Sequence, residues 1–217
     1  MELLVATLAH SSRGNHEEAL ERARSVVETV RNAPGIIQAR CYAGRESEAY
    51  YFILTSWEDE EFWQRAQERY NPKELLLDAS SELFMAAPEQ WLMQYLWGYS
   101  RPSAQQVMAA AVLVSVRPDQ VERIQRDWIE GLQRLAAQPT LAFAFLARAR
   151  NGETLAGSTN ALAARREHAF SPTFLNLLSW PGETQQREFY SDQSYKAIRV
   201  LLNTMGVVRV LTLEPQT

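Results

Sequence analysis

The chain carries the same pattern twice, and this internal repeat constrains its fold more than any other feature. The segments Tyr50–Trp57 and Phe174–Trp180 are both rich in aromatic and aliphatic residues, and both end in tryptophan. Upstream, Pro34 is echoed by Pro139, 105 residues later, whereas the two tryptophans lie 123 residues apart. The second copy has therefore gained about 18 residues between these points. A repeat of this length predicts two similar modules rather than one large domain.

Each half alternates predicted strands and helices in the order β-α-β-β-α-β, which is the ferredoxin-like arrangement. Apolar runs predict strands over residues 3–9, 36–42, 50–57 and 90–97, and again over 108–116, 141–150, 174–180 and 207–213. Helical spacing is found after Asn15, after Glu58, over 73–83, after Pro118 and over 192–203. Asn15, with Glu18 three residues later, predicts a capping box at the first helix. Asn151-Gly152 predicts a hairpin turn.

The two first helices carry matching apolar stripes. Adding 105 to the positions of one stripe gives the other: Ala19, Ala23, Val27 and Val30 become Ile124, Trp128, Leu132 and Leu135. The turn-rich segment Gly98–Ser103 predicts the linker, so we expect modules at 1–100 and 101–217, with an insertion near 153–170 in the second. An antiparallel sheet with helices on one side leaves its other face open, and a second sheet can cover it. We therefore expect an α+β fold in which one chain supplies both sheets.

Composition excludes several functional classes. The net charge is −4, and the 22 basic and 26 acidic residues are interspersed, which argues against nucleic-acid binding. No apolar run approaches the about 20 residues that a membrane span needs, and the first residues do not resemble a signal peptide. One cysteine, Cys41, excludes an internal disulfide and fits a reducing compartment, so we expect a cytoplasmic protein. The three histidines lack metal-ligand spacing, and we expect no metal site.

Two segments carry a family resemblance. Ala33–Ile36, with Pro-Gly after the first helix, and Tyr51–Glu58, which ends in Trp-Glu, resemble the antibiotic-biosynthesis monooxygenase family of the dimeric α+β barrel superfamily. The resemblance implies two tandem ferredoxin-like modules that form an intramolecular dimeric α/β barrel pseudo-dimer. It also implies a small-molecule ligand or substrate. The family includes quinone-forming monooxygenases, haem-degrading enzymes and members of no known activity, and fold alone does not imply function.

One motif extends the resemblance to chemistry. Family members that oxygenate anthrone-like rings without metal or flavin carry Asn-x-x-x-Trp on the third strand, and Asn176 and Trp180 match it. In the first copy, Ile53 occupies the matching position, so Trp57 stands without an Asn partner. Residues four apart on a strand share a face and lie about 13 Å apart. The resemblance implies a cofactor-independent monooxygenase site in the second module, acting on an aromatic or polyketide-like molecule.

In this hypothesis Asn176 stabilises an enolate as an oxyanion-type partner, and Trp180 supplies a flat apolar wall and an indole N–H. No residue is assigned as the base. By sequence, His168, Tyr190 and Tyr195 are the nearest candidates for the base and for contact with substrate. The insertion that contains His168 is a candidate lid, interface element or disordered loop, and composition does not separate these three.

Other readings stand beside this one. Packing alone explains Trp180, and a buried Asn176 can simply pair with a neighbouring group. A non-catalytic small-molecule-binding or stress-response module is the alternative function. Haem degradation is disfavoured, because Thr7 occupies the strand position where the haem-degrading relatives carry Asn, and neither second helix contains the ligating His. The chain could be a monomeric pseudo-dimer or a homodimer.

Overall fold

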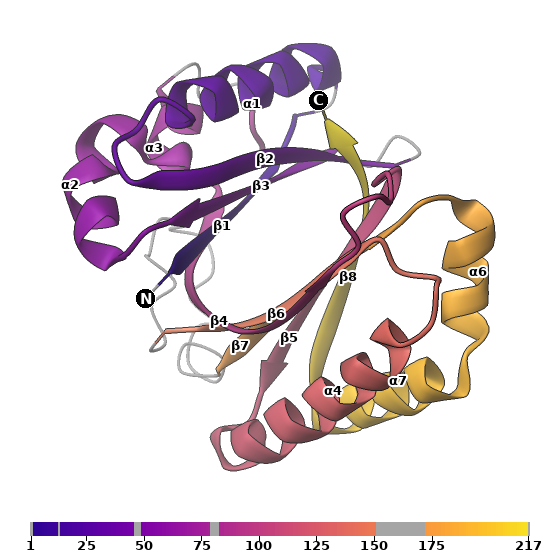
Figure 1. Ribbon diagram of the computed structural model, residues 1–217. Coiled ribbons are helices and arrows are strands. Elements are labelled where there is room, and N and C mark those ends of the chain that lie inside the picture. Colours follow the sequence, from indigo (N-terminus) through magenta and orange to yellow (C-terminus); the bar gives the residue numbers. More distant parts are fainter. Residues whose placement is uncertain (1, 13, 46–48, 79–82, 151–171, 217) are drawn as a thin grey trace. The chain divides into compact units, whose positions relative to one another are not determined.

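The computed structural model describes residues 2–12, 14–45, 49–78, 83–150 and 172–216 (Figure 1). Contacts within the chain divide these residues into two compact units. Unit 1 contains residues 2–94 and 214–216, and unit 2 contains 95–150 and 172–213. The predicted boundary between residues 100 and 101 remains a prediction.

Unit 1 has the predicted β-α-β-β-α-β order. Its elements are β1 (Leu3–His10), α1 (His16–Val30), β2 (Ile36–Gly44), β3 (Tyr50–Trp57), α2 (Glu60–Tyr70), α3 (Pro72–Leu77) and the first half of β4 (Glu89–Ser100). The strands pair antiparallel in the order β2-β3-β1-β4. Thr7, for example, lies opposite Ile53 on β3 and Gln90 on β4.

Unit 2 repeats the order. It contains β5 (Met108–Val116), a 3-10 turn (Pro118–Gln120), α4 (Val121–Ala136), β6 (Phe143–Ala149), β7 (Thr173–Trp180), α6 (Glu183–Ser191), α7 (Gln193–Met205) and most of β8 (Gly206–Gln216). Its strands pair antiparallel in the order β6-β7-β5-β8. The predicted fold class is confirmed: α+β, with two tandem ferredoxin-like modules in one chain.

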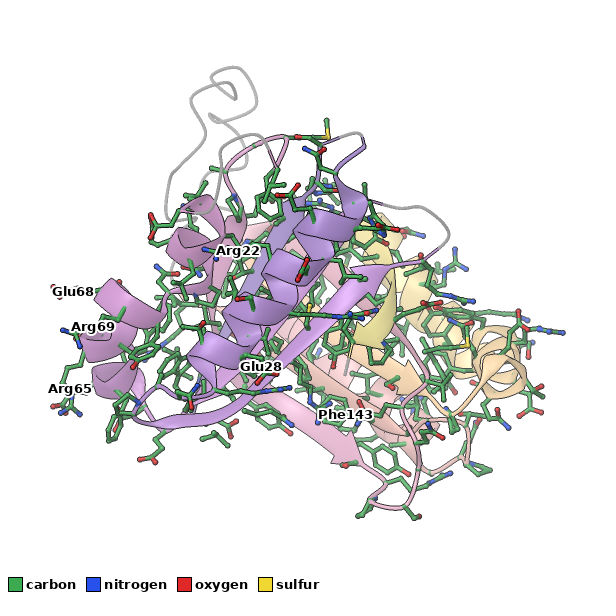
Figure 2. The ribbon with its side chains drawn as sticks, turned by 90° about the horizontal axis from the view of Figure 1, so that it is seen from above. Arg22, Glu28, Arg65, Glu68, Arg69 and Phe143 are labelled. Atoms are coloured by element: carbon green, nitrogen blue, oxygen red, sulfur yellow. The ribbon has the colours of Figure 1, made fainter. Side chains whose placement is uncertain are left out.

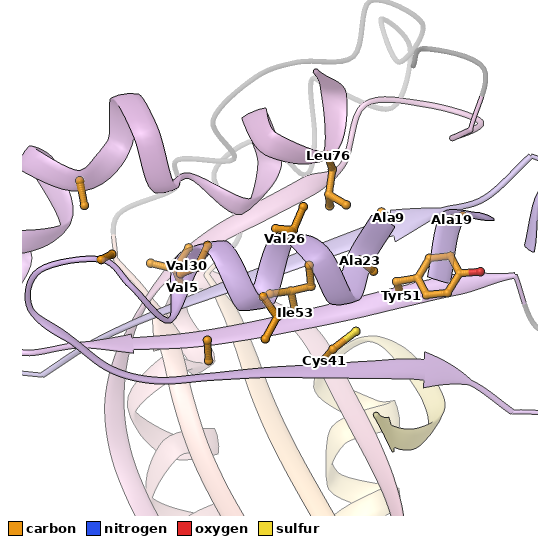
Figure 3. Close-up of a cluster of buried hydrophobic side chains, with 14 of the residues drawn as sticks. Val5, Ala9, Ala19, Ala23, Val26, Val30, Cys41, Tyr51, Ile53 and Leu76 are labelled. Atoms are coloured by element: carbon orange, nitrogen blue, oxygen red, sulfur yellow. The ribbon is translucent and has the colours of Figure 1, made fainter. Parts of the chain in front are cut away.

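The matching helix stripes form the core of each unit. All eight stripe positions are buried, with Ala23 and Ile124 at 0% exposure. Figure 3 shows Val26, Ala23 and Val30 of α1 facing the strands that carry Val5, Ile53 and Cys41. Burial raises the pKa of the Cys41 thiol to about 12, so the thiol stays protonated inside this core.

Several local predictions are wrong, including the helix over 73–83, which ends at Leu77. The side chain of Asn15 makes no capping hydrogen bond, so the predicted capping box is absent. The strand predicted to end at residue 97 continues to Ser100, because Leu96, Trp97 and Tyr99 pack against the core of unit 2. The short helix α6 was not predicted; its few apolar residues gave too weak a periodic signal. The predicted hairpin turn at 151–152 lies outside the described residues.

The surface is charged and mixed in sign. Figure 2 shows Arg65, Glu68 and Arg69 pointing outward from α2. The ion pairs on the helices are solvent-exposed, such as Arg65 with Glu61 at 3.8 Å, and pairs of this kind contribute little to stability. None of the helices that the structure describes is long and apolar enough to cross a membrane.

Gly131 of α4 marks a close approach between α4 and α7. A Cβ atom at this position would lie 2.5 Å from the Cδ1 atom of Ile198. Alanine normally stabilises a helix interior by up to about 1 kcal/mol relative to glycine, but overpacking costs about 1–3 kcal/mol. We expect Gly131→Ala to lower the free energy of unfolding by about 1 kcal/mol, measured by denaturant titration. A variant more stable than the parent would contradict this packing.

Candidate functional site

Strand β7 presents four side chains to the helices of unit 2. Phe174, Leu178 and Trp180 belong to the core cluster that includes the buried stripe of α4. Because side chains alternate along a strand, Asn176 lies on the same face. Asn176 is 2% exposed and Trp180 is 0% exposed. The two residues of the sequence motif therefore share the helix-facing side of the sheet.

Asn176 is the polar exception on this face. Its Nδ2 atom donates a hydrogen bond of 2.7 Å to the backbone carbonyl oxygen of Phe145 on β6. A carbonyl only accepts hydrogen bonds, so the amide nitrogen must face β6 and the orientation of the amide is determined. Within the described part of the chain, no side chain pairs with Oδ1 of Asn176. A buried amide with one structural bond keeps further hydrogen-bonding capacity for a ligand.

A pocket of about 60 Å³ adjoins Asn176. It lies between β5, β7 and β8 on one side and α4 and α7 on the other. Its walls are mainly apolar and its polar groups few; it is lined by Val112, Trp128, Asn176, Tyr195, Ile198, Arg199, Leu202, Asn203, Val208 and Val210. An apolar pocket with a few convergent polar groups is typical of small-molecule sites. The structure brings Asn176 and Tyr195 together here, but neither Trp180 nor Tyr190 lines the pocket.

Trp180 instead begins an aromatic cluster beside the pocket. Its ring centroid lies 5.3 Å from that of Phe189 and 5.4 Å from that of Tyr190. The ring of Tyr195 lies 4.6 Å from Phe189 and 5.1 Å from Tyr190. Trp180 therefore does not line the pocket itself. It packs against Phe189 and Tyr190, and these two rings pack against Tyr195, which does line the pocket. The indole Nε1 of Trp180 is buried and has no hydrogen-bond partner among the described groups.

The two tyrosines of this cluster are proton donors at neutral pH. Burial raises the pKa of both Tyr195 and Tyr190, and the nearby Arg199 guanidinium opposes this rise only partly. Their hydroxyl groups therefore stay protonated near pH 7, because burial disfavours the charged phenolate. Each can donate a hydrogen bond, but neither is a resting base.

Two polar residues of the pocket were missed by sequence reasoning. Arg199 and Asn203 follow Tyr195 at intervals of four along α7, so all three lie on one face of the helix. Arg199 and Asn203 are exposed, whereas Tyr195 is buried, so the polar pair lies at the mouth of the pocket. The regular spacing of three polar side chains on one helix face was the signal that could have identified them.

The remaining predicted site residue, His168, lies outside the described residues, as does the predicted insertion. No carboxylate or imidazole lines the pocket in the part of unit 2 that the structure describes. Among residues 2–12, 14–45, 49–78, 83–150 and 172–216, no group of three or more potential metal ligands is found.

Unit 1 has no equivalent of this polar site at the matching position. Ile53 takes the place of Asn176 and belongs to an apolar core cluster. Trp57 takes the place of Trp180, but its indole Nε1 donates a 2.9 Å hydrogen bond to the hydroxyl of Thr55. In unit 2 the position that matches Thr55 is Leu178, which has no hydroxyl group. The indole N–H at this matching position is thus hydrogen-bonded in unit 1 and without a partner among the described residues in unit 2.

This difference predicts unequal effects of the same substitution. Trp57→Phe removes a buried hydrogen bond in addition to ring volume, whereas Trp180→Phe removes volume and an unpartnered donor. We expect Trp57→Phe to be the more destabilising by about 1 kcal/mol. Denaturant unfolding of the two variants measures the difference. Equal losses would mean that the Thr55 hydrogen bond contributes nothing.

Comparison with known families agrees with this architecture. The fold is α+β, and the pocket of unit 2 lies against one face of its sheet. Residues 3–70 match the family model described as "Antibiotic biosynthesis monooxygenase". The resemblance predicted from the sequence is thereby confirmed, and the matched segment lies in unit 1. A comparison with curated proteins gives no match.

Solved structures resemble the whole chain. An anthrone oxidase-like protein has a TM-score of 0.75 at 11% identity, over 100% of this chain and 92% of its own. A Fusobacterium nucleatum protein described as a candidate monooxygenase has a TM-score of 0.73 at 8% identity, over 100% and 93% of the two chains. A major regulator of staphylococcal pathogenesis has a TM-score of 0.54 at 8% identity, over 100% of both chains. At these identities the likeness shows the fold.

Proposed function

We propose that the protein is a cofactor-independent monooxygenase that acts on an aromatic or polyketide-like small molecule in the pocket of unit 2. One observation carries the proposal: Asn176, the buried amide on the helix-facing side of β7, lines an otherwise mainly apolar pocket. A buried polar group costs free energy unless it is satisfied, and packing alone would favour an apolar residue there, as at Ile53 in unit 1.

The chemistry requires a substrate with an acidic ring C–H next to a carbonyl group. Loss of the proton gives an enolate, which transfers one electron to O2; the resulting radical pair then forms a C–O bond. The hydroperoxide loses water, so one CH2 group and one O2 become one C=O group and one H2O. The protein must favour the enolate, and in this proposal the second N–H of Asn176, whose first N–H is bound to Phe145, donates to the enolate oxygen.

The other pocket groups have roles that follow from their charge and protonation state. The positive charge of Arg199 lowers the energy of an anion formed in the pocket, and the protonated hydroxyl of Tyr195 can donate to a developing oxyanion. Both effects lower the pKa of the substrate itself. Since no described pocket residue is a carboxylate or imidazole, water or the substrate's own oxygen is the proton acceptor in this proposal. Trp180 does not contact the substrate in this proposal. It packs against Phe189 and Tyr190, which hold the ring of Tyr195 in position.

Oxygen uptake tests the proposal. Metal-free and flavin-free protein is mixed with anthrone, and O2 consumption and quinone formation are followed together. We expect one O2 consumed per quinone formed, with no accumulation of hydrogen peroxide. Peroxide in stoichiometric yield would indicate simple autoxidation and contradict the mechanism. An uptake rate equal to that of buffer would leave the binding module as the better description.

That alternative, a non-catalytic small-molecule-binding or stress-response module, has one specific observation in its favour. The pocket offers hydrogen-bond donors and a positive charge, but no base among the residues that the structure describes. Such a set of groups can hold a ligand without transforming it. A stoichiometric small molecule that copurifies with the protein, without oxygen consumption, would support this function instead.

A further inference from the structure

Arg199 gives the pocket a single positive charge. Ten residues line the described pocket. Five of them are aliphatic, one is Trp128, three are neutral and polar, and Arg199 alone carries a charge. Its guanidinium is close enough to Tyr190 and Tyr195 to influence the titration of both hydroxyl groups. Arg199 also follows Tyr195 by one turn of α7, so the two residues lie on the same face of the helix and both line the pocket.

Arg199 differs from the other arginines of these helices in having no carboxylate partner. Arg187 pairs with Glu183 at 3.1 Å, and Arg134 pairs with Glu130 at 3.4 Å, each one helical turn away. The positions four residues before and after Arg199 are Tyr195 and Asn203, which also line the pocket. The helix α7 contains no acidic residue. Within the described residues, Arg199 makes no ion pair, so its charge is available to a ligand.

We propose that the natural ligand of this pocket is an aromatic acid, whose ring enters between Trp128 and Asn176 while its carboxylate pairs with Arg199 at the mouth. This inference rests on the proposed function for the location of the site, and it adds the class of the ligand. A carboxylate is favoured over an enolate as the partner of Arg199, because it is an anion before any reaction takes place. The planar guanidinium fork matches a planar carboxylate.

The size of the pocket determines how the aromatic acid is oriented in it. A volume of about 60 Å³ accepts part of one ring, whereas a dry cavity that holds benzene has a volume of about 150 Å³. A charged group cannot enter the apolar interior without losing its hydration. The ring edge therefore points inward, and the carboxylate stays at the exposed Arg199 and Asn203.

Benzoate and its neutral isostere benzamide test the inference. Binding is followed by NMR through the Trp128 indole resonance, which is assigned with Trp128→Phe. We expect benzoate to bind about tenfold more tightly than benzamide, a preference of the size that one charge-assisted contact supplies. Arg199→Gln should remove this preference, and Arg199→Lys should retain part of it. Arg187→Gln, which removes a surface arginine with its own ion pair, should leave the preference unchanged.

Each other outcome overturns the inference. Equal binding of the two probes, a preference that survives in Arg199→Gln, or no shift with either probe up to its solubility limit would each do so. The result is independent of turnover, because no oxygen chemistry is measured. If anthrone is oxidised but the charge preference is missing, only this inference fails. If the preference is present but no oxygen is consumed, the proposed monooxygenase function fails and the acid-binding pocket remains.

Discussion

Asn176→Ala is expected to lower the rate of enzyme-dependent oxygen uptake by about 100- to 1000-fold, the loss typical of removing one oxyanion donor. The substitution removes the only neutral amide on the helix-facing side of β7 and leaves the apolar walls in place. An oxygen electrode with anthrone as substrate measures the rate, and absorbance of the quinone provides a second readout. A variant that keeps more than half of the parent rate would remove Asn176 from the mechanism.

Stability must be separated from activity in this variant. Because Nδ2 of Asn176 donates to the carbonyl of Phe145, its loss should also lower the free energy of unfolding by about 1–2 kcal/mol. Gln90→Ala is the matched control. Gln90 is a buried polar residue of unit 1, 1% exposed, and its Nε2 donates to Thr7 and Asn71 at 3.0 and 2.8 Å. This control should lose comparable stability and keep full oxygen uptake.

The repeat predicted the fold because both copies obey the same burial rule. The mapping of Ala23 onto Trp128 needs no side-chain similarity, since both positions require only an apolar residue facing the sheet. The short helix α6 escaped prediction because its nine residues include only two aromatic side chains, Phe189 and Tyr190, too few to define a period. Because α6 was not predicted, the contacts of Trp180 with Phe189 and Tyr190 could not be predicted either.

The site was predictable only in part. Asn176 was identified because, with Trp180, it matches the Asn-x-x-x-Trp motif that extends the resemblance, and because an amide inside an apolar strand is costly. The hydrogen bond to Phe145 could not be foreseen, because it depends on which strand neighbours β7 and on the register between them. Arg199 was missed for a similar reason: a lone arginine on a helix is usually a solvated surface residue, and only the neighbours of α7 make it a pocket residue.

The second large effect is expected at Trp128. The side chain is 1% exposed, and its ring lies 6.0 Å from that of Phe174 at the inner wall of the pocket. Trp128→Ala removes a large buried ring, and such substitutions usually cost about 3–5 kcal/mol. We expect a loss of that size in denaturant unfolding. A loss below about 1 kcal/mol would contradict the packing of α4 against β7.

The cavity left by Trp128→Ala should bind the group that was removed. Apolar cavities in protein cores stay dry and accept small aromatic molecules, and a ligand that binds only the folded state raises its stability. Added indole should therefore raise the melting temperature of Trp128→Ala by several degrees and leave that of the parent unchanged. Trp128→Phe, which leaves too little space for indole, is the control. Because Trp128 also lines the pocket, the substitution should enlarge the pocket. If indole stabilises the parent and both variants equally, it binds elsewhere, and the assignment of Trp128 to the pocket wall fails.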